Sequence, residues 1–113
     1  MVARFPFSNF SVIELPFRSI QAVLISDRTE AFGGMGADAV RQAQKWLEGN
    51  DDVKVLGVWG HQPSHKSWAI LESDDFEAVS LLLRPQMLIG KVEVMPVNDN
   101  IAMRKNRGHW GSD

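Results

Sequence analysis

The residues best suited to chemistry cluster between Val58 and Leu71, where the sequence reads VWGHQPSHKSWAIL. His61 and His65 are four apart, a spacing that on a helix would place both on one face for a metal ion. A neighbouring glycine and Pro63 argue against a helix there, and no Asp or Glu stands between the two histidines. We therefore predict a solvated hairpin loop and no metal site.

His61 by itself is the stronger candidate for catalysis. It comes just after a predicted strand, where its imidazole could face a cavity under the sheet and act as a general acid or base near neutral pH. Trp59 on the same strand and Trp68 on the next would then supply apolar walls for a ligand. The alternative, which we favour, is that Trp59 packs in the core or in a dimer interface and that His61 is exposed.

Two charged residues at strand ends are further candidates. Glu72 has the same parity along its strand as Trp68 and Ile70, so its carboxylate could serve as a base if that face is covered. If the strand end is open to water, Glu72 is only a polar residue at a boundary, which is the interpretation we favour. Arg28 follows the first predicted strand beside Asp27 and could position an anionic substrate, although a surface ion pair is the commoner outcome there.

Two other motifs suggest a function, but each also has a simpler structural explanation. The GGMG at 33–36 precedes a predicted helix, but it lacks the Lys-Ser/Thr of a Walker motif and the G-x-G-x-x-G spacing, so it indicates a flexible start of a helix. Arg104, Lys105 and Arg107 precede Trp110, a minimal signature of nucleic-acid binding. Three cations without a wider basic surface contribute little affinity, which favours a solvated tail or docking of Trp110 on a partner subunit.

Composition sets the limits within which these residues act. The 113 residues suffice for one domain, and 44% hydrophobic with 23% charged residues is typical of a globular protein. A formal net charge of −2 gives no overall attraction to nucleic acid or acidic membranes. The lack of cysteine excludes disulfides, thiolate ligands and a Cys nucleophile. Without an apolar run long enough for a bilayer or a signal peptide, we expect a cytoplasmic protein with no membrane association.

Hydrophobic periodicity from residue 19 to 97 predicts the order β-α-β-β-α-β, an α+β fold of the ferredoxin-like pattern. The predicted strands are 19–26, 52–59, 67–72 and 90–97, and the predicted helices are 37–49 and 75–83. Arg84-Pro85 is expected to end the second helix. Residues 1–18 form an N-terminal arm or an extra strand, and 98–113 form a polar tail that is irregular or partly helical. A competing interpretation places the first strand at 2–10 and a helix at 19–32.

The strand predicted at 52–59 is apolar on both faces. Simple alternation puts Val53, Val55 and Trp59 on one face and Leu56 and Val58 on the other. A strand of this kind needs cover on both sides, so one layer of helices would not be enough.

The order of motifs from 53 to 97 resembles the dimeric α+β barrel superfamily, in particular its small families of uncharacterised function. A strand V-K-V-L-G-x-W is followed by a polar loop, a strand ending A-I-L-E-S-D-D, a helix and a last strand ending V-x-P-V-N-D. The matching residues are Gly57, Trp59, Ala69, Ile70, Glu72, Asp74, Asp75, Glu93, Val94, Pro96 and Val97.

The resemblance implies ferredoxin-like protomers with an antiparallel sheet that pack sheet to sheet as a dimeric α+β barrel, the partner chain covering the face that the helices leave open. Superfamily relatives include monooxygenases, isomerases, polyketide cyclases, haem-degrading enzymes and ligand-sensing domains, so the fold alone selects no chemistry. We predict a homodimeric protein for small-molecule binding or assembly, with an apolar cavity under the sheet, an apolar or aromatic ligand and no cofactor. The alternatives are a cofactor-free monooxygenase, isomerase or cyclase with His61 as acid or base, and an interaction module that uses the basic tail.

Overall fold

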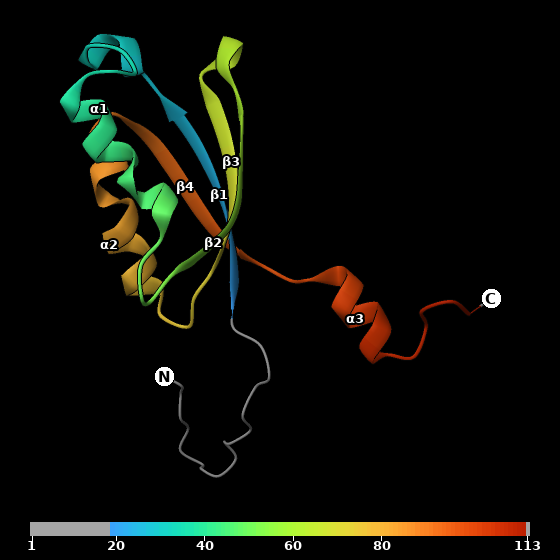
Figure 1. The fold of residues 1–113 in the computed structure, drawn as a ribbon. Helices are drawn as coiled ribbons and strands as arrows, with labels where there is room; N and C mark the ends of the chain where they lie inside the picture. The colour runs from blue at the N-terminus through green and yellow to red at the C-terminus, as the bar shows by residue number, and fades with distance from the viewer. Residues whose placement is uncertain (1–18, 113) are drawn as a thin grey trace.

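The computed structural model describes residues 19–112, which form an α+β fold (Figure 1). The strands are β1 Ile20–Asp27, β2 Lys54–His61, β3 Lys66–Glu72 and β4 Gly90–Val97. The helices are α1 Asp38–Ala43, α2 Phe76–Met87 and α3 Asn100–Asn106. Short 3-10 turns cover Thr29–Phe32, Gln44–Glu48 and Gln62–Ser64. The predicted α+β class is thus confirmed, while the predicted arm at 1–18 and the alternative strand at 2–10 lie outside the described residues.

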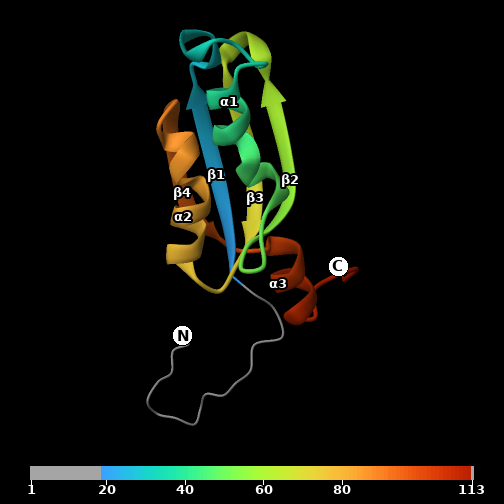
Figure 2. The ribbon, with the colours of Figure 1, turned by 60° about the vertical axis from the view of Figure 1, so that its left-hand side comes forward.

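The strands make one antiparallel sheet in the order β2-β3-β1-β4. β1 is central, since it pairs with β3 on one side and with β4 on the other. The competing prediction of a helix over 19–32 is therefore wrong, because the β-branched and apolar residues of β1 are paired on both sides. Figures 1 and 2 show α1 and α2 on the same face of the sheet, with no helix of the described residues over the opposite face.

The core lies between the sheet and these two helices. Val23, Ile25 and Leu71 of the sheet are buried against Val79 and Leu83 of α2. Alternate residues of each strand supply this side, as the period of two requires. The core therefore accounts for only one of the two faces of the sheet.

The boundaries of α2 show where local signals hold and where packing overrides them. Its start agrees with the predicted acidic cap, because the Asp75 carboxylate accepts a hydrogen bond from the Glu77 N–H at 3.0 Å. The predicted stop at Pro85 is wrong, since α2 runs on to Met87. Proline there costs only a bond of the last turn, and the Trp46 Nε1–H donates to the buried Gln86 Oε1 at 2.9 Å, which holds that turn against the body.

The polar tail contains α3, whose first turn is capped by the Asp99 carboxylate, the acceptor of a 3.0 Å bond from the Ala102 N–H. Figure 1 shows α3 beyond the end of β4, on the side of the sheet away from α1 and α2. Within residues 19–112, no helix has the length and apolar content that crossing a membrane requires.

Candidate functional site

The sheet face turned away from α1 and α2, here called the open face, is apolar at its centre. Strand register places on it the side chains of Ala22, Leu24, Trp59, Trp68, Ile70 and Met95. Trp59 is 60% exposed, Trp68 46% and Met95 56%. Large apolar side chains gathered on one exposed face make this surface a candidate interaction site.

Two of the predicted ligand-binding residues form the aromatic part of this face. Trp59 of β2 stands directly opposite Trp68 of β3 in the sheet. A Cβ built at Gly57 would lie only 2.5 Å from the Trp59 ring, so the indole lies over the glycine backbone. The absence of a side chain at Gly57 therefore lets Trp59 lie flat against the sheet beside Trp68.

A β-bulge in β2 decides that Trp59 belongs to the open face. The register shifts between Val55 and Gly57, so that Leu56 is an additional residue in this strand. As a result, Val55 and Val58 both pack against the core, and Trp59 points to the opposite face. The predicted pairing of Val55 with Trp59 on one face is wrong because strict alternation does not hold across a bulge.

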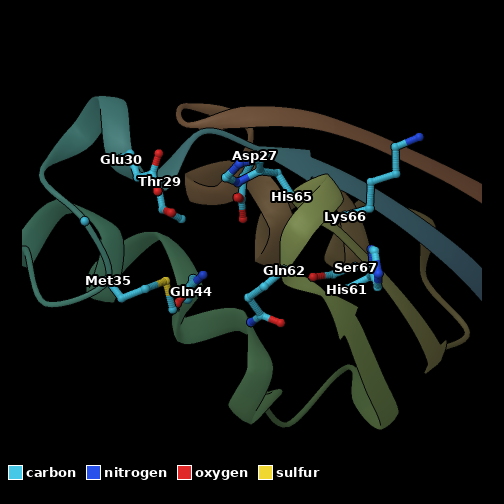
Figure 3. Close-up of a pocket in the computed structure, with 11 residues that line it drawn as sticks. Asp27, Thr29, Glu30, Met35, Gln44, His61, Gln62, His65, Lys66 and Ser67 are labelled. Atoms are coloured by element: carbon cyan, nitrogen blue, oxygen red, sulfur yellow. The ribbon is translucent and has the colours of Figure 1, made fainter.

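The β2–β3 hairpin carries a polar cleft at its tip. A cleft of about 340 Å³ lies between the hairpin turn and the segment after β1. Figure 3 shows Thr29, Glu30 and Gln44 on one side of the cleft and His61 and Gln62 on the other. Carboxylate, imidazole, amide and hydroxyl groups together suit a polar ligand rather than an apolar one.

His61 lies on the exposed hairpin side of this cleft, and its contact is local. Its Nδ1 lies 2.9 Å from the Ser64 Oγ, and the same hydroxyl donates to the His61 carbonyl at 3.3 Å. These bonds within one turn orient the ring and engage its Nδ1 atom. The role of His61 as acid or base stays a prediction.

His65, which the sequence pattern discounts, has a more constrained place than His61. Its backbone is left-handed, with φ of 56°, a conformation that costs energy for a residue with a side chain. Its carbonyl accepts a 3.1 Å bond from the Asp27 N–H, which ties the hairpin tip to the end of β1. This link brings the cleft walls together.

Glu72 is at the other end of the sheet. It pairs with Ile20 and Lys54, whereas His61 pairs with Lys66 at the start of the same strand. The seven residues of β3 separate the two ends by roughly 20 Å. Glu72 and His61 therefore do not form one site.

Arg28 follows β1 at the same end of the sheet as His61 but lines a different cleft. That cleft, of about 590 Å³, lies between the end of β1, the hairpin and the start of β4. Asp27, His65 and Lys66 belong to both clefts, so the two are neighbours. The proposed contact of Arg28 with an anionic substrate stays a prediction.

Several residues of the hairpin cleft have no signal in the sequence. Thr29 and Glu30 belong to a tight turn that continues through Gly33 and Gly34, both with positive φ, whereas Gln44 reaches the cleft from the end of α1. The GGMG motif therefore serves the turn that leads into α1. Antiparallel pairing predicts that the end of β1 and the hairpin tip meet, but not how this turn folds over them.

Among residues 19–112, no three His, Asp or Glu side chains lie close enough to hold a metal ion. No protein-family model, curated protein or solved structure matches the chain. The open face and the hairpin cleft are thus described by their own geometry alone.

Proposed function

We propose that the protein works as a homodimer of the dimeric α+β barrel type, in which two ferredoxin-like protomers pack open face to open face and hold a small apolar or aromatic molecule between their sheets. The observation that carries the proposal is the open face, an apolar surface left without cover by the helices. Trp59 and Trp68 are its proposed ligand-binding walls.

The connectivity of the chain supports the protomer fold. The elements from β1 to β4 follow the order β-α-β-β-α-β, counting the interrupted first helical segment and α2. The antiparallel sheet β2-β3-β1-β4 has both of these helices on one side. An antiparallel sheet can expose one face to water when that face is polar. The open face is apolar at its centre, which favours a partner that covers it.

The size of the open face suits a second sheet. Four strands of seven or eight residues present a face of roughly 19 by 26 Å. Trp59, Trp68 and Met95 alone leave on the order of 350 Å² exposed, which approaches the largest patch of a typical monomer. The half-buried Ala22, Leu24 and Ile70 raise the apolar area to roughly 500 Å², and the charged side chains around them would supply the rest of the ~800 Å² per partner that stable interfaces bury.

The distribution of polar groups supports a copy of the same chain as the partner. Charged side chains lie around the apolar centre, with Lys66 and Lys91 at one end and Lys54 and Glu72 at the other. Glu93 is held at its place by a 3.1 Å ion pair with Lys91. An apolar centre within a polar rim is the usual anatomy of an interface. A two-fold axis brings the apolar centre of one copy against the same centre of the other.

The test is the association state of a variant at the centre of the face. Trp68→Lys places a charge where the sheets meet, and we expect the dimer to weaken at least about 100-fold in sedimentation equilibrium. Leu81→Lys is the matched control, because Leu81 is similarly exposed, at 55%, but lies on α2. A monomeric parent, or equal weakening by both variants, contradicts the proposal.

The hairpin cleft supports a second candidate, the cofactor-free monooxygenase, isomerase or cyclase with His61 as acid or base. Binding of an aromatic probe followed by tryptophan fluorescence separates the two. For the binding protein, Trp59→Ala lowers probe affinity and His61→Ala leaves it unchanged. For the enzyme, His61→Ala lowers turnover by about 10²–10⁴-fold.

A further inference from the structure

We infer that the segment 98–112, here called the C-terminal arm, docks on the acidic end of a second copy of this chain. The inference rests on the homodimer proposed above and adds to it a contact between the arm of each protomer and the body of the other. It assigns a partner to the one helix of the described residues that stands apart from the body.

The position of the arm is the first argument. The arm leaves the sheet at the end of β4, where Val97 pairs with Ile20. Figure 1 shows α3 on the open-face side of the sheet, where a second copy seated on the open face would lie. The arm would therefore run alongside that copy rather than back over its own helices.

The chemistry of the arm is the second argument. Arg104, Lys105 and Arg107 are all exposed, and Ile101 and Trp110 are exposed as well. The Lys105 ammonium lies 5.0 Å from the centre of the Trp110 ring, which gathers cation and aromatic on one surface. Such a surface fits an acidic partner with some apolar area.

The acidic end is that partner surface. It comprises the last residue of the 3-10 turn before β2, the loops that lead into β2 and out of β3, and the first turn of α2: Glu48, Asp51, Asp52, Asp74, Asp75 and Glu77. Both loops lie at the end of the sheet where Lys54 pairs with Glu72, the same end from which the arm leaves. A two-fold axis parallel to the strands brings these ends of the two copies together.

The arm is long enough to reach the body of the partner. Its position keeps it away from the acidic end of its own chain. The two residues that link β4 to α3 and the seven residues of α3 carry the basic side chains roughly 17 Å from the end of the sheet, and the long Arg and Lys side chains extend this reach. Two packed sheets and the partner's helix layer require on the order of 20 Å, with about 10 Å between layers. The acidic loops of the same chain lie on the helix side of the sheet, opposite the arm (Figure 1).

A nucleic acid is the competing partner for a basic arm with an aromatic residue. The protein carries 14 acidic against 12 basic residues, so no wider basic surface supports the three cations of the arm. Three cations by themselves contribute little affinity for a phosphate backbone. The observations therefore favour the second copy, and nucleic-acid binding becomes an outcome of the test.

The experiment is a charge swap in the full-length protein, read by sedimentation equilibrium at low salt. The arm variant carries Arg104→Glu, Lys105→Glu and Arg107→Glu. The body variant carries Glu48→Lys, Asp51→Lys and Glu77→Lys. We expect each variant to weaken the dimer roughly 10- to 100-fold. Combining all six substitutions in one chain restores the attraction, and we expect most of the affinity to return. High salt should remove the differences between the proteins. Far-UV circular dichroism checks that each variant is folded.

The outcomes separate this inference from the dimer itself. If the parent is monomeric, both proposals fall. Suppose that the parent is a dimer and that Trp68→Lys disrupts it. If the charge variants then leave the dimer affinity unchanged, or if the combined variant does not regain it, only the arm contact is wrong. A last case is a parent that binds a labelled single-stranded oligonucleotide in a salt-dependent way. If the arm variant loses this binding while its dimer affinity is unchanged, the partner of the arm is nucleic acid and the arm contact is wrong.

Discussion

The buried bond between Trp46 and Gln86 offers the sharpest test of how the helical layer is held. The Trp46 Nε1–H donates to Gln86 Oε1 at 2.9 Å, and both side chains are buried. The Gln86 Nε2 has no hydrogen-bond partner within the described residues. Trp46→Phe keeps an aromatic ring but leaves the whole Gln86 amide without a partner.

We expect Trp46→Phe to lower the free energy of unfolding by about 2–4 kcal/mol. Of this, ~1–3 kcal/mol comes from the lost bond and the stranded amide. About 1 kcal/mol more comes from the smaller ring, at ~24 cal/mol per Å³ of cavity. The loss is large against the ~5–15 kcal/mol by which domains are stable.

Gln86→Leu completes the cycle. Removing both polar groups is expected to cost less than the two single changes added together, because neither partner is then left buried and unpaired. Urea unfolding followed by circular dichroism gives the four free energies, at one protein concentration because dimerisation shifts apparent stability. A coupling energy within about 0.3 kcal/mol of zero would show that the bond does not hold the last turn of α2 beyond Pro85.

Three further predictions use urea unfolding with matched variants. Gly33→Ala should destabilise by about 1–3 kcal/mol, since φ is 104° and the new Cβ would lie 2.8 Å from a neighbouring Cβ, whereas Gly36→Ala, with open space around it, should stabilise by ~0.4–1 kcal/mol. Asp75→Ala should cost about 1 kcal/mol through the cap of α2, while Asp99→Ala should cost less, because α3 stands apart from the body of its own protomer. His65→Gly should stabilise by up to about 1 kcal/mol by relieving its left-handed backbone. Equal effects within either pair, or destabilisation by His65→Gly, would contradict the local geometry.

Much of the fold could be predicted because it depends on short-range patterns. The Val-rich run of β2, the alternation in β4 and the acidic cap of α2 each report a local preference that packing did not override. The predicted stop at Pro85 failed for the opposite reason: a residue distant in sequence, Trp46, binds the turn that follows.

The candidate site could be predicted only in part. Residue type alone indicates five candidates, namely Trp59, Trp68, His61, Glu72 and Arg28. It does not indicate which ends of the strands lie next to one another. Pairing register puts the two tryptophans side by side and sends Glu72 to the far end of the sheet from His61. Register depends on contacts across strands, which a single sequence does not display.

Local sequence patterns were enough to predict the α+β class, the places of the strands and one strand with two apolar faces, which helices on one side of the sheet could not cover. Those properties follow from composition and from the period of side-chain direction along the backbone. Strand pairing settles which side chains occupy the open face, because the bulge beside Gly57 reverses the faces of the residues that follow it. The side of the sheet on which the arm lies is likewise a property of the folded chain, which the polar composition of 98–112 does not reveal.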